Sequence, residues 1–131
     1  MKPATALPLR RLLAGLLPLA AALASSAHAA GGTPGASVFA SECAECHSAA
    51  PAKNKKGPTL FGVVGRRAGS VSDYNYSDAM KQSQWTWSDD KLRSYLSQPA
   101  SKALPGSKMK YDGLDDTKQL QDLITYLHSL H

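Results

Sequence analysis

The sequence Cys43-Ala44-Glu45-Cys46-His47 contains the only two cysteines among the 131 residues, and a histidine directly follows the second cysteine. On a helix, positions i, i+3 and i+4 lie on one face. Both sulfurs and the imidazole of His47 can therefore reach the same object together. This spacing is typical of c-type haem attachment, in which the two thiols bond to the haem vinyl groups and the histidine binds the iron.

Two other kinds of cysteine site fit the sequence less well. A thioredoxin-like dithiol is expected in a strand–helix context with a βαβ pattern, which this sequence does not show. A structural zinc site needs about four ligands. The sequence has no further cysteine, and the remaining histidines are His28, His128 and His131, far from the motif. The motif therefore favours haem attachment.

Residues 1–29 have the pattern of a secretory signal peptide. Three basic residues precede an apolar run at 12–24, and Ala27-His28-Ala29 fits a small-x-small cleavage site. The apolar run is short for a membrane span, which needs about 20 residues, and an uncleaved anchor is the alternative. The sequence therefore predicts export to the periplasm and one mature domain at 30–131. The basic residues are Lys2, Arg10 and Arg11.

The high positive charge of the chain comes largely from this leader. The whole sequence has 15 basic and 10 acidic residues, a net charge of +5. The leader holds three of the basic residues and no acidic one, so residues 30–131 keep 12 against 10, a net charge of +2. The charge therefore gives no reason to expect nucleic-acid binding.

The mature chain shows helical segments and no evident pair of strands. Thr33 as N-cap and Pro34 at the first helical position predict a first helix that runs to about His47. A short helix is expected to begin at Tyr76 or Ser77, and a clearer one at Ser88. The clearer helix should stop before a proline, Pro99.

The last helix is predicted at about 115–130, where leucine and isoleucine repeat at intervals of three and four residues. Residues 48–75 and 99–114 are predicted to be loops. A loop as long as 48–75 is unusual inside a small domain. A prosthetic group resolves this difficulty, because the loop can wrap around an apolar surface that replaces a protein core. The predicted fold is therefore all-α.

Further motifs follow Cys43–His47 in a fixed order, and together they resemble a class I cytochrome c of the mitochondrial and bacterial soluble type from about Gly35 to Leu130. The resemblance implies a small cytochrome c fold with about four to five helices and long loops wrapped around one covalently bound haem. The matching segments are Gly57-Pro58-Thr59-Leu60-Phe61-Gly62-Val63-Val64-Gly65-Arg66, Tyr74-Asn75-Tyr76-Ser77-Asp78-Ala79, Trp87, Tyr95-Leu96, Pro99, Pro105-Gly106-Ser107-Lys108-Met109 and Asp122-Leu123-Ile124-Thr125-Tyr126-Leu127.

The resemblance implies that Met109 is the second axial ligand, opposite His47. A thioether is a soft, neutral ligand, so His/Met ligation raises the reduction potential. Met80, on the expected short helix, is the competing candidate. An iron with six ligands has no open position for a substrate, which favours electron transfer over catalysis.

By the same resemblance, five other residues surround the haem. Pro58 would orient the imidazole of His47 through its carbonyl region. Tyr95 would form a hydrogen bond near the methionine sulfur. Arg66, Tyr76 and Trp87 would hold the haem propionates, which need donors where they are buried. An ordinary aromatic core is the alternative for Trp87 and Tyr95.

The chain also departs from the family pattern. Met80 stands where mitochondrial relatives commonly have a polar asparagine, which should make that side of the pocket drier. Glu42 and Asp115-Asp116 stand where those relatives tend to have lysines. By the resemblance, the remaining lysines would lie beside the exposed haem edge and form a basic docking patch; ordinary solvated lysines are the alternative. The remaining lysines are Lys102, Lys108 and Lys110, with Lys53, Lys55 and Lys56 on the other side.

The sequence thus predicts a monomeric periplasmic carrier of single electrons, which docks transiently with redox partners. These partners are expected to be respiratory or photosynthetic membrane complexes or soluble dehydrogenases. One alternative is a dedicated electron-transfer subunit of a periplasmic dehydrogenase. The other is a haem enzyme or gas sensor with a labile sixth ligand.

Overall fold

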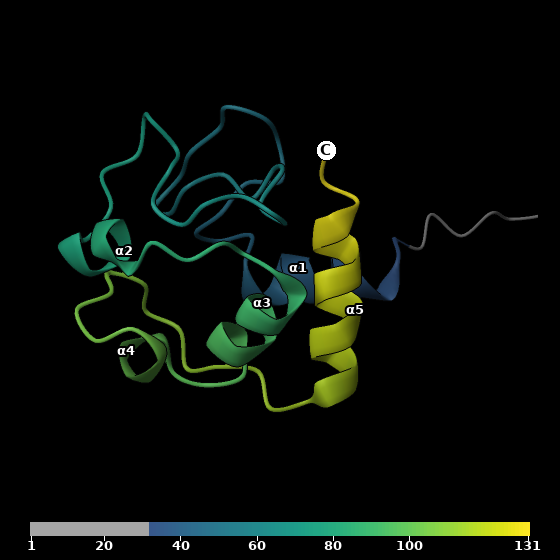
Figure 1. Ribbon diagram of the computed structural model, residues 1–131. Helices are drawn as coiled ribbons and strands as arrows, with labels where there is room; N and C mark the ends of the chain where they lie inside the picture. The colour runs from purple at the N-terminus through teal and green to yellow at the C-terminus, as the bar shows by residue number, and fades with distance from the viewer. Residues whose placement is uncertain (1–31) are drawn as a thin grey trace, which may run out of the picture.

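The computed structural model describes residues 32–131, so the expected signal peptide at 1–29 lies outside the described residues. The described chain is all-α, as predicted, with helices joined by long loops (Figure 1). Within this part, Arg67 and Thr86 form an isolated antiparallel bridge and no strand is present. The helices are α1 Pro34–Glu42, α2 Asp78–Ser83, α3 Asp89–Leu96, α4 Ala100–Ala103 and α5 Thr117–His128.

The helices begin where the sequence places polar capping residues. The side-chain oxygens of Thr33, Ser77 and Ser88 accept hydrogen bonds from the backbone N–H three residues later, at 3.2–3.3 Å. Asp116 caps α5 in the same way, through the N–H of Gln119 at 2.9 Å. These bonds satisfy N–H groups that have no partner inside the helix. The predicted starts of α1, α2 and α3 are therefore confirmed.

The predicted end of the first helix is wrong, because α1 stops at Glu42 and the cysteine motif follows it. The N–H groups of Cys43 and Ala44 both bond to the carbonyl of Phe39, each at 2.9 Å, and this breaks the regular ladder. The chain nevertheless keeps turning, since the N–H of His47 reaches the carbonyl of Cys43 at 2.8 Å. Such a turn still brings both cysteines and the histidine to one side.

The predicted loop at 99–114 contains the short helix α4, which the sequence did not indicate. Pro99 caps it, and its carbonyl accepts from the N–H groups of Lys102 and Ala103 at 2.9 Å. Ala100 is fully buried and anchors this turn to the core. Four residues are too few to show a helical pattern of apolar residues, so tertiary packing decides this element.

Helices α1 and α5 cross in direct contact (Figure 1). Gly35 makes this approach possible, because a Cβ built on it would lie 2.0 Å from the carbonyl oxygen of Asp122. The rings of Phe39 and Tyr126 pack beside it with centroids 5.4 Å apart. Leu123 and Ile124 are completely buried, so the apolar face of α5 forms the centre of the core.

The long loop at 48–75 has no helix, as predicted, and is held by backbone hydrogen bonds to distant segments. Gly62 N–H bonds to the carbonyl of Leu130 at 2.5 Å, near the end of the chain. Gly65 N–H bonds to Trp87 at 2.9 Å, and Ala68 N–H bonds to Trp85 at 2.8 Å. These bonds hold the loop against the rest of the domain. No helix within 32–131 has the length and apolarity needed to cross a membrane.

Replacement of Gly35 by alanine should destabilise the fold, because the new methyl group would collide with the backbone of α5. Overpacking of this kind costs about 1–3 kcal/mol, which urea unfolding would measure. Gly32→Ala is the matched control, since its Cβ would meet Ala36 at an ordinary 3.4 Å. The two variants should therefore differ. Equal stabilities would show that the helices can separate without cost.

Candidate cofactor site

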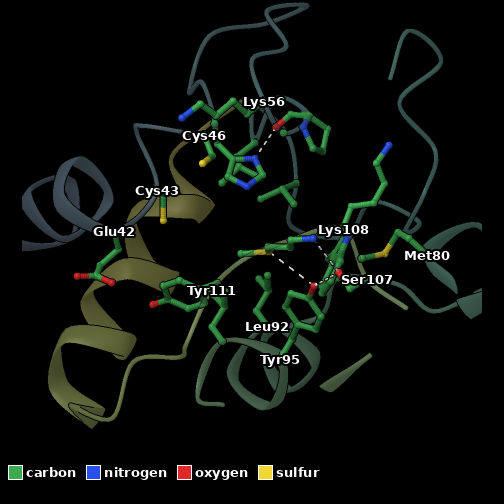
Figure 2. Close-up of a pocket in the computed structure, with 18 of the residues that line it drawn as sticks. Glu42, Cys43, Cys46, Lys56, Met80, Leu92, Tyr95, Ser107, Lys108 and Tyr111 are labelled. Carbon is green, nitrogen blue, oxygen red and sulfur yellow. Dashed lines mark hydrogen bonds between the residues drawn. The ribbon is translucent and has the colours of Figure 1, made fainter. Parts of the chain in front are cut away.

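A cavity of about 500 Å³ lies between the cysteine motif, the loops and helices α3 and α5. Pockets of this size hold compact organic ligands. Figure 2 shows Cys43 and Cys46 on one side of the cavity, with Tyr95 and Leu92 below them. Every residue that the sequence analysis assigned to the site lines this one cavity. These residues are Cys43, Cys46, His47, Pro58, Arg66, Tyr76, Trp87, Tyr95 and Met109.

The two thiols are free, with Cys43 buried and Cys46 partly buried. Burial raises the pKa of the Cys43 thiol to about 12, and the nearby charges of Glu42 and Cys46 add to this effect. A redox dithiol works through a thiolate whose pKa is lowered. The environment of Cys43 has the opposite effect, so the structure disfavours the thioredoxin-like alternative.

The imidazole of His47 is held in one orientation. Its Nδ1 lies 2.7 Å from the carbonyl oxygen of Pro58, and because a carbonyl can only accept, Nδ1 carries the proton. Burial is the main effect that lowers the pKa of His47, and the charges of Arg66 and Lys55 lower it further. The ring is therefore neutral at pH 7, and its Nε2 lone pair is free to bind a metal.

Gly57 holds the face of this ring and was not assigned to the site by the sequence analysis. A Cβ built on Gly57 would lie 2.4 Å from Cε1 of His47 and 2.7 Å from Nδ1. The backbone of Gly57 also bonds to the carbonyl of Cys46, at 2.7 Å. The glycine before Pro58 was visible in the sequence, but its role depends on how closely the loop approaches His47.

The sulfur of Met109 accepts a hydrogen bond from the hydroxyl of Tyr95 at 3.6 Å. The same hydroxyl lies 3.2 Å from Oγ of Ser107, which accepts from the N–H of Met109, also at 3.2 Å (Figure 2). These bonds fix both the backbone and the side chain of Met109. Ser107 was missed as a site residue, although a serine two residues before Met109 is a recognisable turn signal.

A group of hydrogen-bond donors lies elsewhere on the cavity wall. Arg66 donates to the carbonyls of Phe61 and Thr59, each at 2.8 Å, so two of its guanidinium nitrogens are held in place. A guanidinium has five N–H donors, which leaves three for a ligand. Tyr76 and Trp87, whose side chains carry an O–H and an N–H donor, line the same cavity. An anionic group of a ligand would find donors here.

Two further lining residues bear on the chemistry of the cavity. Met80 is 9% exposed and places a second thioether in the cavity, on the side where Figure 2 shows Ser107. The hydroxyl of Tyr111 is buried and has no hydrogen-bond partner among the described residues. Sequence analysis did not assign Tyr111, because nothing in the local pattern distinguishes it from an ordinary core tyrosine.

Several lysines of the predicted basic patch are bonded to the protein itself. Lys56 forms an ion pair with Glu45 at 2.6 Å, and Lys55 donates to the carbonyl of Ala44. Lys108 donates to the carbonyl of Asn75 at 2.5 Å. The patch is therefore less uniform than the sequence suggested, and Lys108 also fastens the methionine loop to the segment that precedes α2.

The cavity fits haem c. It is mainly apolar, it presents two thiols on one side, and it supplies a neutral imidazole and thioethers as donors for iron. The donors around Arg66 suit two carboxylates. No group of three or more histidine, cysteine or acidic side chains elsewhere in residues 32–131 is placed to hold a metal ion.

Comparison with known proteins gives a consistent result. A family model described as cytochrome c matches residues 32–131. The chain is 42% identical over 120 residues to cytochrome c2 of Blastochloris viridis, covering 91% of this chain and 92% of that protein. It is 47% identical over 94 residues to cytochrome c of Arabidopsis thaliana, covering 71% and 83%. The solved structure of cytochrome cH from Methylobacterium extorquens has a TM-score of 0.68 and 41% identity, and covers 73% of this chain and 95% of that one.

Replacement of Gly57 by alanine should displace the ring of His47, because the new methyl group would overlap it. The Nδ1–H···O bond to Pro58 should lengthen, and the NMR resonance of that proton should move. Gly62→Ala is the matched control: its φ of +64° strains an alanine, but no atom lies within 4 Å. The control should lose about 1–2 kcal/mol of stability through backbone strain and leave the His47 proton unchanged. An unmoved proton in Gly57→Ala would contradict this role.

Proposed function

This chain belongs to the cytochrome c family, and we propose that it is a periplasmic carrier of single electrons in which His47 and Met109 are the axial ligands of iron. One haem c, bound covalently through Cys43 and Cys46, is its cofactor. Proteins of this family are small electron carriers rather than enzymes.

The observation that carries the ligand assignment is the way in which the two donor atoms are fixed. His47 is oriented by Pro58, and Met109 is held at both its backbone and its sulfur by Ser107 and Tyr95. Met80 lines the cavity, but the hydrogen bonds around it involve its backbone and not its sulfur. The pre-organised thioether is thus Met109, in keeping with the family resemblance.

Bound haem supplies a one-electron couple between ferric and ferrous iron. The residues of the chain determine how readily the iron gains or loses this electron. His47 donates its Nδ1 proton to Pro58, which strengthens Nε2 as a donor, whereas the hydroxyl of Tyr95 withdraws electron density from the sulfur of Met109. Because each ligand is already held in place, little rearrangement should accompany the gain or loss of an electron.

The cavity wall limits the access of water. Leu92, Leu123 and Val63 line it and are nearly or fully buried, and Met80 adds an apolar surface where a polar side chain would retain water. A dry pocket lowers the local dielectric constant and disfavours the form with the higher net charge. We expect this wall to contribute to a raised reduction potential.

The proposed location follows from the leader pattern at 1–29, which predicts export. We propose that the mature chain works as a monomer. Its partners would be respiratory or photosynthetic complexes of the membrane, or soluble dehydrogenases, which it meets by transient docking.

Replacement of Met109 by alanine should lower the reduction potential and open the iron to added ligands such as imidazole, because the thioether is lost. The weak far-red absorption band of methionine-ligated ferric haem should disappear. Met80→Ala is the matched control and should retain the band. The assignment is reversed if Met80→Ala removes the band while Met109→Ala keeps it.

Replacement of either cysteine by alanine should leave one thioether or strip most of the haem, because each sulfur makes its own bond to the cofactor. Acid–acetone extraction followed by mass spectrometry of the chain measures this directly. The unaltered protein should keep its haem through the extraction. Haem recovered from it in the organic phase would disprove covalent attachment.

A further inference from the structure

The side chain of Tyr111 ends in a hydrogen-bond donor that lacks an acceptor. Its hydroxyl is buried and has no hydrogen-bond partner among residues 32–131. A buried polar group without a partner costs free energy, because it has given up its bonds to water. Burial raises the pKa of this hydroxyl, and the charge of Glu42 raises it further. The hydroxyl therefore keeps its proton and can donate it to an acceptor.

Glu42 carries a carboxylate that faces this donor. Figure 2 shows the carboxylate beside the hydroxyl of Tyr111, on the side of the cavity that carries Cys43. The other acidic residue in the cavity lining is Glu45, which forms an ion pair with Lys56 at 2.6 Å. Glu42 takes part in no ion pair within the described part of the chain. Its oxygens are therefore available to accept a hydrogen bond.

The position of Glu42 in the chain is unfavourable for α1 itself. Glu42 is the last residue of α1, and the last turn of this helix contains no basic side chain. The C-terminal end of a helix carries a partial negative charge, so a carboxylate there is repelled. A donor on another segment would offset this cost.

Tyr111 also follows the proposed iron ligand Met109 by two residues. Its backbone carbonyl accepts a hydrogen bond from the N–H of Ala100 at 2.9 Å, and Ala100 is fully buried. On the other side of Met109, Ser107 and Lys108 hold the chain through their own hydrogen bonds. A bond from the side chain of Tyr111 would fasten the second side as well.

We propose that Tyr111 is a positioning residue for Met109, and that its hydroxyl donates a hydrogen bond to the carboxylate of Glu42. This bond ties the methionine loop, residues 104–111, to the end of α1. A small rotation of the exposed Glu42 side chain completes it. The bond opposes movement of the loop away from the cavity and so keeps Met109 in place. The inference rests on the proposed function, in which Met109 binds the iron.

The test is the affinity of added imidazole for the ferric holoprotein, because imidazole can bind only after Met109 has left the iron. Tyr111→Phe removes the hydroxyl and keeps the ring. Glu42→Ala removes the acceptor and leaves a strong helix former at the end of α1. Each variant should bind imidazole about tenfold more tightly than the original protein.

Two more variants show whether the two residues act through one bond. The double variant Tyr111→Phe/Glu42→Ala should bind imidazole no more tightly than either single variant, because both changes remove the same interaction. Glu42→Gln keeps an acceptor oxygen without the charge, and its affinity should stay within about threefold of the original. This partial rescue would not be expected if Glu42 acted through its charge alone.

The matched controls make the same chemical changes away from the proposed bond. Tyr126→Phe removes the hydroxyl of a tyrosine in α5 that does not line the cavity. Asp112→Ala removes an exposed carboxylate that is next to Tyr111 in the chain and does not line the cavity either. Both controls should bind imidazole within about twofold of the original affinity.

Hydrogen exchange provides a second readout that separates loop opening from a general loss of stability. The N–H of Met109, which bonds to Oγ of Ser107, should exchange faster in Tyr111→Phe and Glu42→Ala. The N–H of Ile124, in the buried centre of α5, should exchange at its original rate. A change confined to the loop is the result expected of a positioning residue.

The proposal is overturned if Tyr111→Phe binds imidazole as weakly as the original protein, or if the effects of the two single changes add in the double variant. It is also overturned if Asp112→Ala binds imidazole as tightly as Glu42→Ala. Failure of the proposed function has a different signature. The original ferric holoprotein would then lack the far-red band, and Met109→Ala would bind imidazole no better than the original protein.

Discussion

The close crossing of α1 and α5 is the contact on which the rest of the structure depends. Gly35 lets the backbones touch, and Phe39 and Tyr126 close the contact beside it. This crossing holds α1 in place, and Cys43 and the following turn continue directly from its end. The site is thus built on a rigid helix pair, whereas its opposite wall comes from loops whose position depends on hydrogen bonds to distant backbone groups.

The parts of the fold that could be predicted are those encoded in short stretches of sequence. Capping residues such as Thr33 and Ser88 act on the next three residues, so the starts of α1 and α3 could be found without a structure. The end of α1 and the existence of α4 could not. The first depends on two N–H groups sharing the carbonyl of Phe39, and the second on the burial of Ala100, which distant residues provide.

In the candidate site, too, residues with distinctive side-chain chemistry could be predicted, whereas residues whose role depends on their neighbours could not. Residues with distinctive chemistry, such as His47 and Met109, were identified from the sequence and the family pattern, and the cavity brings them together. Gly57 and Ser107 were missed because a glycine and a serine acquire their roles from what lies beside them. Long lysine side chains were also harder to interpret. The sequence assigned Lys108 to the docking patch, yet its side chain also fastens the methionine loop to Asn75.

The aromatic residues of the cavity wall give the protein an internal optical reporter. Its only two tryptophans, Trp85 and Trp87, pack against each other with ring centroids 5.7 Å apart, and Trp87 lines the cavity directly. A haem so near accepts the excitation energy of both indoles, so their fluorescence should be quenched in the folded protein. Emission should return when the loop that contains them leaves the cavity. One intrinsic signal therefore follows the opening of the cofactor site without any added label.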